Sequence, residues 1–207
     1  MPTERPRVAP TTDDDWDDDT RRILTGLAAY SDGRVLNVLR TVARHPKLLK
    51  RWTVFGNHVM GASTLPVRER ELIILRTGFL AASRYEWAQH VAIARAAGCT
   101  DDEILRIIDG PDAPEWTDDD RTLLRAADEL MTDHFISDST WSALRDRCTE
   151  QQCIDLVFTV GQYNLVAMAC NTLRVQIDDG VECFPPDQFA HGRFRERPSS
   201  PSENEVK

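Results

Sequence analysis

The feature that most constrains the fold is a long segment, residues 150–176, that is apolar on almost every side. Its apolar residues are Ile154, Leu156, Val157, Phe158, Val160, Leu165, Val166, Ala167, Met168, Ala169 and Leu173. A helix with apolar side chains all round is either buried or packed against another subunit. The segment therefore predicts a helix that other parts of the protein have to cover.

The same segment contains four polar residues, Gln162, Tyr163, Asn164 and Asn171. Buried polar side chains need hydrogen-bond partners. We expect these four to satisfy one another, and the alternative is that they line a substrate pocket. Tyr163 is the candidate substrate-binding residue among them.

Apolar residues at helical spacing predict helices along most of the remaining chain. The segments are residues 21–30, 34–44, 47–60, 66–80, 84–97, 100–108, 117–133 and 137–147. Thr100 and Glu103 have the spacing of a capping box, and Gly98 is a plausible end for the helix before them. Every strong segment is helical, so the sequence predicts an all-α fold.

Composition divides the chain into one domain and two tails. Residues 1–19 are polar and strongly acidic, which predicts a flexible acidic arm that buries little surface. Residues 20–183 are expected to form one helical domain, since 207 residues can bury a sizeable core. Residues 184–207 contain several prolines and many polar residues, and we expect an extended or disordered tail.

The charge balance favours a small-molecule substrate. The chain has 34 acidic and 25 basic residues, a net charge of −9, and no separate cluster of Lys and Arg. This pattern weakens nucleic acid and anionic membranes as partners. No uninterrupted apolar run approaches the roughly 18 residues of a membrane helix, and the first ten residues lack the apolar core of a signal peptide. We therefore expect a cytoplasmic protein.

The cysteines do not form a recognisable motif. The five cysteines are Cys99, Cys148, Cys153, Cys170 and Cys183. Their number is odd, and no Cys-x-x-Cys pair or zinc-ligand spacing occurs among them. We interpret them as small buried hydrophobic residues, because free cysteine is among the most buried residue types.

Two acidic residues and one histidine between positions 71 and 90 form the most informative pattern. Glu86 and His90 are four residues apart, so on a helix they share one face and can shift each other's pKa. Glu71 is expected on the preceding helix, where it can orient His90. The alternative for Glu71 is a simple pairing with Arg68 or Arg70 at the start of that helix. The three residues predict a site for proton transfer.

This pattern resembles the carboxymuconolactone decarboxylase family, which includes the alkylhydroperoxidase D-type proteins. The similar features are Arg70-Glu71-Leu72, the apolar helix from Ile73 to Leu80, the Glu86 and His90 pair, and Ala94 to Gly98 followed by Asp101, Asp102 and Glu103. The resemblance is specific over residues 64–108 and weaker over residues 20–178. In the peroxidase branch the positions of Ser83 and Glu86 would both be cysteines. Neither thiol is present, and the Glu four residues before the His resembles the decarboxylase branch.

The resemblance implies an alkylhydroperoxidase D-like bundle of about seven to eight helices, and a homo-oligomer such as a trimer or hexamer. It implies decarboxylase-like acid–base chemistry on a small organic acid or lactone, by a lyase without a metal or other cofactor. His90, Glu86 and Glu71 would be the catalytic residues, with His90 moving the proton and Glu86 or Glu71 setting its tautomer. Ser83 and Arg68 join Tyr163 as candidate substrate-binding residues.

Three questions stay open at the level of the sequence. A substrate carboxylate would call for an arginine, and Arg68, Arg76 and Arg84 are equivalent candidates. A thiol peroxidase of the alkylhydroperoxidase or peroxiredoxin type is the first alternative function, and it requires a remote cysteine such as Cys99 or Cys153 to approach His90. A non-catalytic binding or assembly protein on the same scaffold is the second alternative.

Overall fold

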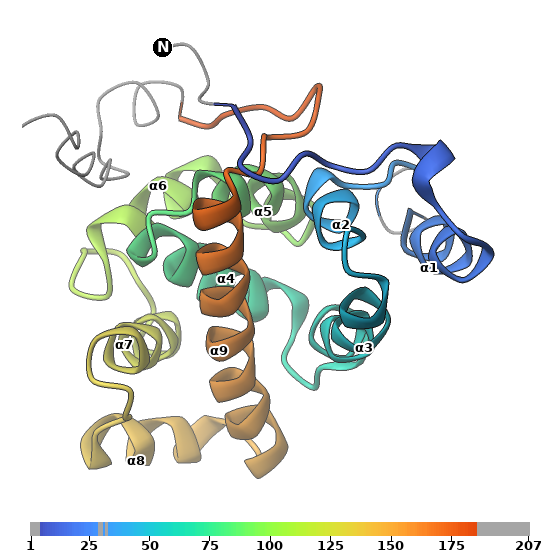
Figure 1. Ribbon diagram of the computed structural model, residues 1–207. Coiled ribbons are helices and arrows are strands. Elements are labelled where there is room, and N and C mark those ends of the chain that lie inside the picture. Colours follow the sequence, from blue (N-terminus) through green and yellow to red (C-terminus); the bar gives the residue numbers. More distant parts are fainter. Residues whose placement is uncertain (1–4, 29–30, 32, 186–207) are drawn as a thin grey trace, which may run out of the picture.

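A computed structural model describes residues 5–28, 31 and 33–185, and the regular structure in this part of the chain is helical (Figure 1). The α-helices are α1 (Asp18–Ala28), α2 (Asn37–Val42), α3 (Pro46–Asn57), α4 (Val67–Leu80), α5 (Arg84–Ala96), α6 (Asp101–Asp109), α7 (Asp118–Thr132), α8 (Asp138–Arg147) and α9 (Glu150–Leu173). A short 3-10 helix, Asp13–Asp15, precedes α1, and a π-helix, η2 (His58–Ala62), follows α3. The predicted all-α fold is confirmed.

Helix α4 lies at the centre of the bundle. It contacts α5, α6, α7 and α9, and α9 runs across it (Figure 1). All of its residues from Arg70 to Gly78 are buried, including two arginines and a glutamate. Buried charges require partners, so the polar groups of α4 are expected to be paired inside the fold.

Helix α9 is the apolar helix that the sequence indicated. By length and composition it alone among the described residues could cross a membrane, but 56% of its most apolar window is buried within the fold. Leu156, Val160 and Val166 lie in hydrophobic clusters, whereas Phe158 and Leu165 are exposed. One side of α9 therefore belongs to the core of a helical domain. The cytoplasmic location stays a prediction.

The helix ends differ from the sequence expectations in three places. The last helix ends at Leu173 instead of near position 176, because Arg174 has a left-handed backbone with φ of 56°. The helix expected over residues 34–44 is limited to α2, and that expected over residues 47–60 changes from α to π geometry at His58. The capping box of Thr100 and Glu103 is present, and Gly98 has a positive φ of 96° just after α5.

Two side chains of the described N-terminal segment, Thr11 and Trp16, are buried. Trp16 is buried, its indole Nε1 donates to the Thr11 hydroxyl at 2.8 Å, and the Arg40 guanidinium lies over its ring. This burial differs from the expectation that residues 1–19 bury little surface, because one large aromatic ring docks beside α2. The division into an arm, a domain and a tail stays a prediction, and residues 186–207 lie outside the described part.

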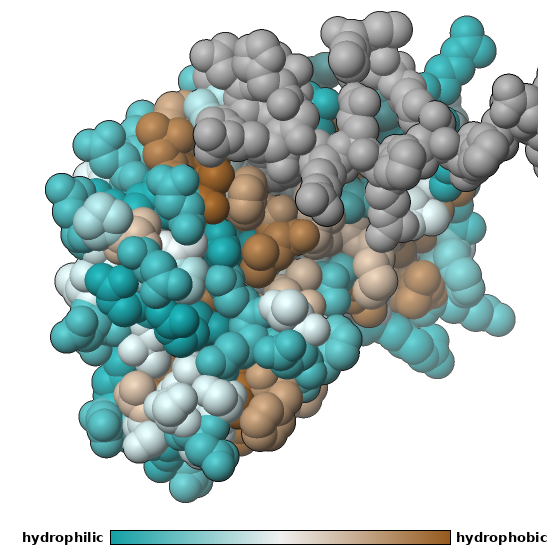
Figure 2. All heavy atoms as spheres, turned by 90° about the vertical axis from the view of Figure 1, so that its left-hand side faces the viewer, coloured by the Kyte–Doolittle hydropathy of each residue, from teal (hydrophilic) through white to brown (hydrophobic). Residues whose placement is uncertain are grey.

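The surface on the side of α7 and α8 is mostly hydrophilic, with separate hydrophobic patches (Figure 2). Four of the five cysteines are buried and Cys183 is partly buried, and all five are free thiols. The interpretation of the cysteines as small buried residues therefore holds for four of them.

Candidate active site

Helices α4 and α5 bring the predicted acid–base residues together. Ser83 begins α5 as its N-cap, and its hydroxyl accepts from the Glu86 amide at 3.4 Å. Gly78 of α4 faces Glu86 closely, since a Cβ added at Gly78 would lie 3.3 Å from the Glu86 Cβ. The absence of a side chain at Gly78 thus allows the close approach that places Glu86 beside α4.

The His90 ring lies between two carboxylates. Its Nδ1 is 2.7 Å from Oε2 of Glu71, and its Nε2 is 3.8 Å from Oε2 of Glu86. The sequence pattern predicted this meeting of Glu71, Glu86 and His90. Glu71 has no exposed surface, whereas Glu86 and His90 retain 4% and 6%. Glu71 therefore lies behind the histidine, and the other two form the outer part of the cluster.

Arg70 holds Glu71 in place. Its Nε and Nη2 are 3.1 and 3.0 Å from Oε1 of Glu71, and its Nη1 donates to the Met60 carbonyl at 2.7 Å. Glu71 therefore uses one oxygen for Arg70 and the other for His90. The pairing with Arg70 that the sequence offered as an alternative occurs together with the contact to His90, because a carboxylate can accept on both oxygens.

The buried environment changes the acid–base properties of the cluster. Burial raises the pKa of Glu86 to about 7, although the nearby His90 acts in the opposite direction. Burial alone would lower the pKa of His90, but the charge and hydrogen bond of Glu71, together with the charge of Glu86, raise it. Glu71 and Glu86 therefore favour the charged form of His90, and Glu86 is the group poised to gain or lose a proton near neutral pH.

Helix α9 closes the cluster with Tyr163 and Cys170. The Tyr163 ring packs edge-on against the His90 ring at 4.8 Å between centroids, and its hydroxyl contacts Met60 Sδ at 2.8 Å. The Cys170 thiol donates to Oε1 of Glu86 at 3.7 Å. Burial and the Glu86 charge raise the pKa of Cys170 well above its ordinary value. The thiol is thus protonated where it meets the carboxylate.

Sequence reasoning did not select Cys170, Met60 or the double contact of Arg70. A signal for Cys170 exists, since it lies seven residues after Tyr163 and thus on the same face of α9. Cys170, not Cys99 or Cys153, is the cysteine that approaches the acid–base cluster. Met60 had no such signal, because its position depends on the π-helix after α3.

The arginines proposed for substrate recognition have other partners. Arg68 binds Asp120 at 2.7 Å and also pairs with Glu103. Arg76 pairs with Asp128 at 2.8 Å and donates to the Ile107 carbonyl at 2.7 Å. The structure therefore places Arg68 in a separate ion-pair network, while Ser83 and Tyr163 lie next to Glu86 and His90.

The polar residues of α9 do not satisfy one another as expected. Tyr163 contacts Met60, and Asn171 Nδ2 donates to the Ala81 carbonyl at 2.9 Å. The side chain of Gln162 has no hydrogen-bond partner in the described part of the chain. The expectation fails because adjacent residues on a helix point in different directions.

Comparisons with known proteins agree with this geometry. Residues 46–129, which contain η2, α4, α5 and α6, match the carboxymuconolactone decarboxylase family. This central segment is thus similar to that family. A comparison with curated proteins gave no match.

Solved structures with the same fold cover most of the chain. A peroxidase-related protein with an alkylhydroperoxidase AhpD core from Ralstonia eutropha has 20% identity and a TM-score of 0.75, covering 86% of this chain and 94% of its own. A peroxidase-related protein from Silicibacter has 21% identity and a TM-score of 0.72, covering 94% and 98%. The debrominase Bmp8, in complex with 2,3,4-tribromopyrrole, has 13% identity and a TM-score of 0.72, covering 86% and 94%. These similarities establish the AhpD-like fold.

The sequence resemblance implies that Ser83 and Glu86 occupy the positions of the two cysteines of the peroxidase branch. No set of three or more His, Cys, Asp or Glu side chains in the described residues has the arrangement of a metal site. The metal-free and cofactor-free mechanism stays a prediction. The cluster thus provides a carboxyl group with a pKa of about 7 beside an imidazole whose pKa is raised by Glu71 and Glu86.

Proposed function

We propose that this protein is an enzyme of general acid–base chemistry that acts on a small organic acid or lactone, by decarboxylation or a related proton transfer. The observation that carries the proposal is the buried side chain of Glu86. Its pKa is about 7, and it lies next to His90, whose ring is held by Glu71. A catalytic acid or base works best when its pKa is near the working pH. Strongly perturbed groups of this kind concentrate at functional sites.

Each residue of the cluster has a separate role in this proposal. Glu86 exchanges the proton with a substrate carbon. The charged His90 stabilises the negative charge that develops on the substrate, and Glu71 with Arg70 fixes the orientation of the imidazole. The sequence had assigned the moving proton to His90. The pKa of Glu86 near 7, together with the raised pKa of His90, favours Glu86 instead.

A decarboxylation can be written with these groups alone. The bond between the substrate carbon and its carboxylate breaks, carbon dioxide leaves, and the electron pair stays on the carbon. The neutral carboxyl of Glu86 gives its proton to that carbon, and Glu86 takes a new proton from water. Proton transfer in the opposite direction, from a carbon next to a carbonyl to ionised Glu86, gives an isomerase with the same parts.

The test measures proton transfer without knowing the natural reaction. Ketones, keto acids and lactones are incubated in deuterated water, and deuterium entering the carbon next to the carbonyl is followed by NMR. Glu86→Gln is expected to lower the exchange rate by roughly 10²–10⁴-fold, the usual contribution of a positioned acid or base. Glu150→Gln changes an exposed glutamate at the start of α9 and serves as the matched control.

The exchange should also depend on pH. Removal of a carbon proton needs ionised Glu86, so its rate should rise as the pH passes the pKa of about 7. Decarboxylation uses protonated Glu86 for its last step, so its rate should fall as the pH rises through about 7. Equal rates for wild type and Glu86→Gln on every compound that reacts would refute the proposal.

The thiol peroxidase is a weaker candidate. It would need Cys170 as a thiolate, and burial raises the pKa of that thiol well above its ordinary value. Hydroperoxide reduction that disappears in Cys170→Ser would favour it over the acid–base reaction. A non-catalytic scaffold would show neither activity.

We also propose that the chain forms a homo-oligomer. The support is a set of large apolar side chains outside α9 that are exposed in the single chain, including Val67 at the start of α4 and Phe135 after α7. Burial of apolar surface is the main driving force of association. Analytical ultracentrifugation gives the number of subunits, and a monomer at micromolar concentration would contradict the proposal.

A further inference from the structure

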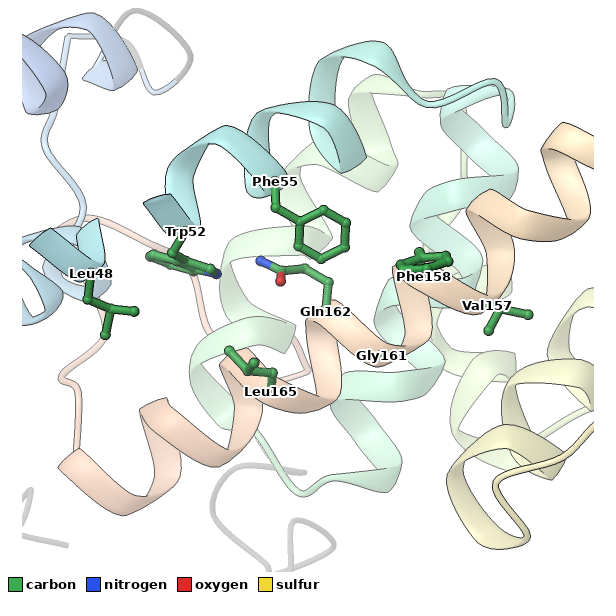
Figure 3. Close-up of a pocket in the computed structure, with 8 residues that line it drawn as sticks. All are labelled: Leu48, Trp52, Phe55, Val157, Phe158, Gly161, Gln162 and Leu165. Carbon is green, nitrogen blue, oxygen red and sulfur yellow. The ribbon is translucent and has the colours of Figure 1, made fainter. Parts of the chain in front are cut away.

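A groove between α3 and α9 has the composition of a small-molecule site (Figure 3). Its volume is about 540 Å³, within the usual range of ligand pockets of about 300–1,000 Å³. The lining residues are Leu48, Trp52, Phe55, Val157, Phe158, Gly161, Gln162 and Leu165. The Phe55 and Phe158 rings meet edge-on with centroids 6.0 Å apart. The groove is thus a largely apolar, aromatic-walled space.

Two polar groups in this groove have no partner in the described structure. The indole Nε1 of Trp52 is buried and makes no hydrogen bond. Gln162 is only 5% exposed, and its carboxamide makes no hydrogen bond with a described residue. Figure 3 shows the Gln162 carboxamide between the rings of Trp52 and Phe55. A buried polar group without a partner costs free energy, so the buried Trp52 Nε1 points to a ligand that supplies the missing acceptor, and the Gln162 carboxamide can donate to the same ligand.

The chemistry of the lining restricts that ligand. Trp52 Nε1 can only donate, and the amide nitrogen of Gln162 can also donate. The lining contains no charged side chain among the described residues. A carboxylate there would be a charge without a partner in an apolar site, which is unfavourable. A neutral carbonyl oxygen can accept both hydrogen bonds without this cost.

We propose that the α3–α9 groove binds an uncharged, planar, mostly apolar carbonyl compound, with its oxygen held by Trp52 Nε1 and Gln162. The groove shares a wall with the acid–base cluster, because Phe55 also packs in the apolar cluster of Val59, Ile74 and Tyr163. Tyr163 in turn contacts His90. That the bound carbonyl compound is also the substrate rests on the proposed function, whereas the binding itself does not.

Three small aromatic probes of similar size separate the contributions of hydrogen bonding, apolar contact and charge to binding in the groove. Acetophenone has a neutral carbonyl, ethylbenzene lacks the acceptor, and benzoate carries a charge. Ligand-observed NMR titrations of the full chain should give an affinity for acetophenone about tenfold higher than for either of the others, as two neutral hydrogen bonds permit. Equal affinities for acetophenone and ethylbenzene, or no binding of acetophenone at all, would overturn the proposal.

Two conservative variants locate the binding. Gln162→Leu and Trp52→Phe each remove a hydrogen-bond donor and leave an apolar side chain in the groove. Each is expected to lower the affinity for acetophenone several-fold while leaving that for ethylbenzene within about twofold. Trp141→Phe alters a partly exposed tryptophan of α8 outside the groove and is the matched control. If the preference for acetophenone survives Gln162→Leu, the assignment of Gln162 is wrong.

The same samples separate this inference from the proposed function. Glu86→Gln should bind acetophenone like wild type, because Glu86 does not line the groove. Unchanged deuterium exchange in Glu86→Gln with normal groove binding would contradict the proposed function alone. Deuterium exchange in a chain that binds no acetophenone in the groove would contradict the groove proposal alone. An affinity for acetophenone that falls as the protein concentration rises would mean that a second copy of the chain covers the groove, and this outcome would also overturn the groove proposal.

Discussion

Replacing Glu86 by glutamine should make folding stability less dependent on pH. A glutamate in water has a pKa of about 4.3, and burial raises that of Glu86 to about 7. Each pKa unit corresponds to about 1.4 kcal/mol, so ionisation of Glu86 costs the folded state on the order of 4 kcal/mol. A glutamine side chain cannot ionise, so the Glu86→Gln variant escapes this cost.

The direction follows from the protonation of the two states. Below about pH 4 the carboxyl is protonated in both folded and unfolded chains, and the stability is fully present. Between about pH 4.3 and 7 the unfolded chain loses the proton while the folded chain keeps it, so stability falls as the pH rises. Above pH 7 the loss is complete. Between pH 5.5 and 8.5 Glu86 should lower the free energy of unfolding by roughly 2 kcal/mol.

The assay is urea unfolding of wild type and Glu86→Gln at pH 5.5 and 8.5, with equal protein concentrations. The raised pKa of His90 acts in the same direction. The contribution of His90 to folding stability is fully present below its ordinary pKa and is lost as the pH rises through its raised pKa in the folded state. His90 is present in both chains, so their difference reports mainly Glu86. Equal loss of unfolding free energy in both chains would refute the assignment of a neutral, buried Glu86 at pH 5.5.

Three further predictions concern the surroundings of the cluster. Glu71→Gln leaves Arg70 buried without its partner and should lower the free energy of unfolding by about 3 kcal/mol, measured by urea unfolding, with partial recovery when Arg70→Met is added; an unchanged midpoint would contradict the pairing. Gly110→Ala should lower it by about 1–3 kcal/mol, since the added Cβ would lie 2.8 Å from Arg76 Nη2 at a φ of +91°; a stabilised variant in thermal unfolding would show that Arg76 moves freely. Cys170→Ser should retain deuterium exchange within about threefold, and its loss would assign the thiol a direct part in the reaction.

The central helices and the acid–base cluster could be predicted from the sequence because their signals are local. The spacing of Glu86 and His90 sets a common helix face, and the capping box at Thr100 fixes where α6 begins. Glu71 needed one further assumption, that consecutive helices pack side by side. Contacts of this kind depend on few residues, all close in sequence.

The remaining site residues depend on the tertiary arrangement. Met60 reaches Tyr163 only because the chain changes to π geometry after α3, and no residue type announces that change. The sequence favours Arg68 as a ligand for a substrate carboxylate, but in the structure Arg68 pairs with Asp120 and Glu103. These partners lie 52 and 35 positions away in the sequence, so no local pattern indicates the pairing. The groove was also invisible in the sequence, since Trp52 and Gln162 are brought together across more than a hundred residues of chain.

Helix α9 serves both the acid–base cluster and the groove. Tyr163 and Cys170 face His90 and Glu86, while Phe158 and Leu165 line the groove on another side of the same helix. An α-helix turns by about 100° for each residue. One residue inserted between Tyr163 and Leu165 would therefore rotate the Cys170 thiol away from Glu86 and carry Leu165 out of the groove. Related chains can exchange side chains along α9 freely, but insertions and deletions within it should be absent from those that keep both sites.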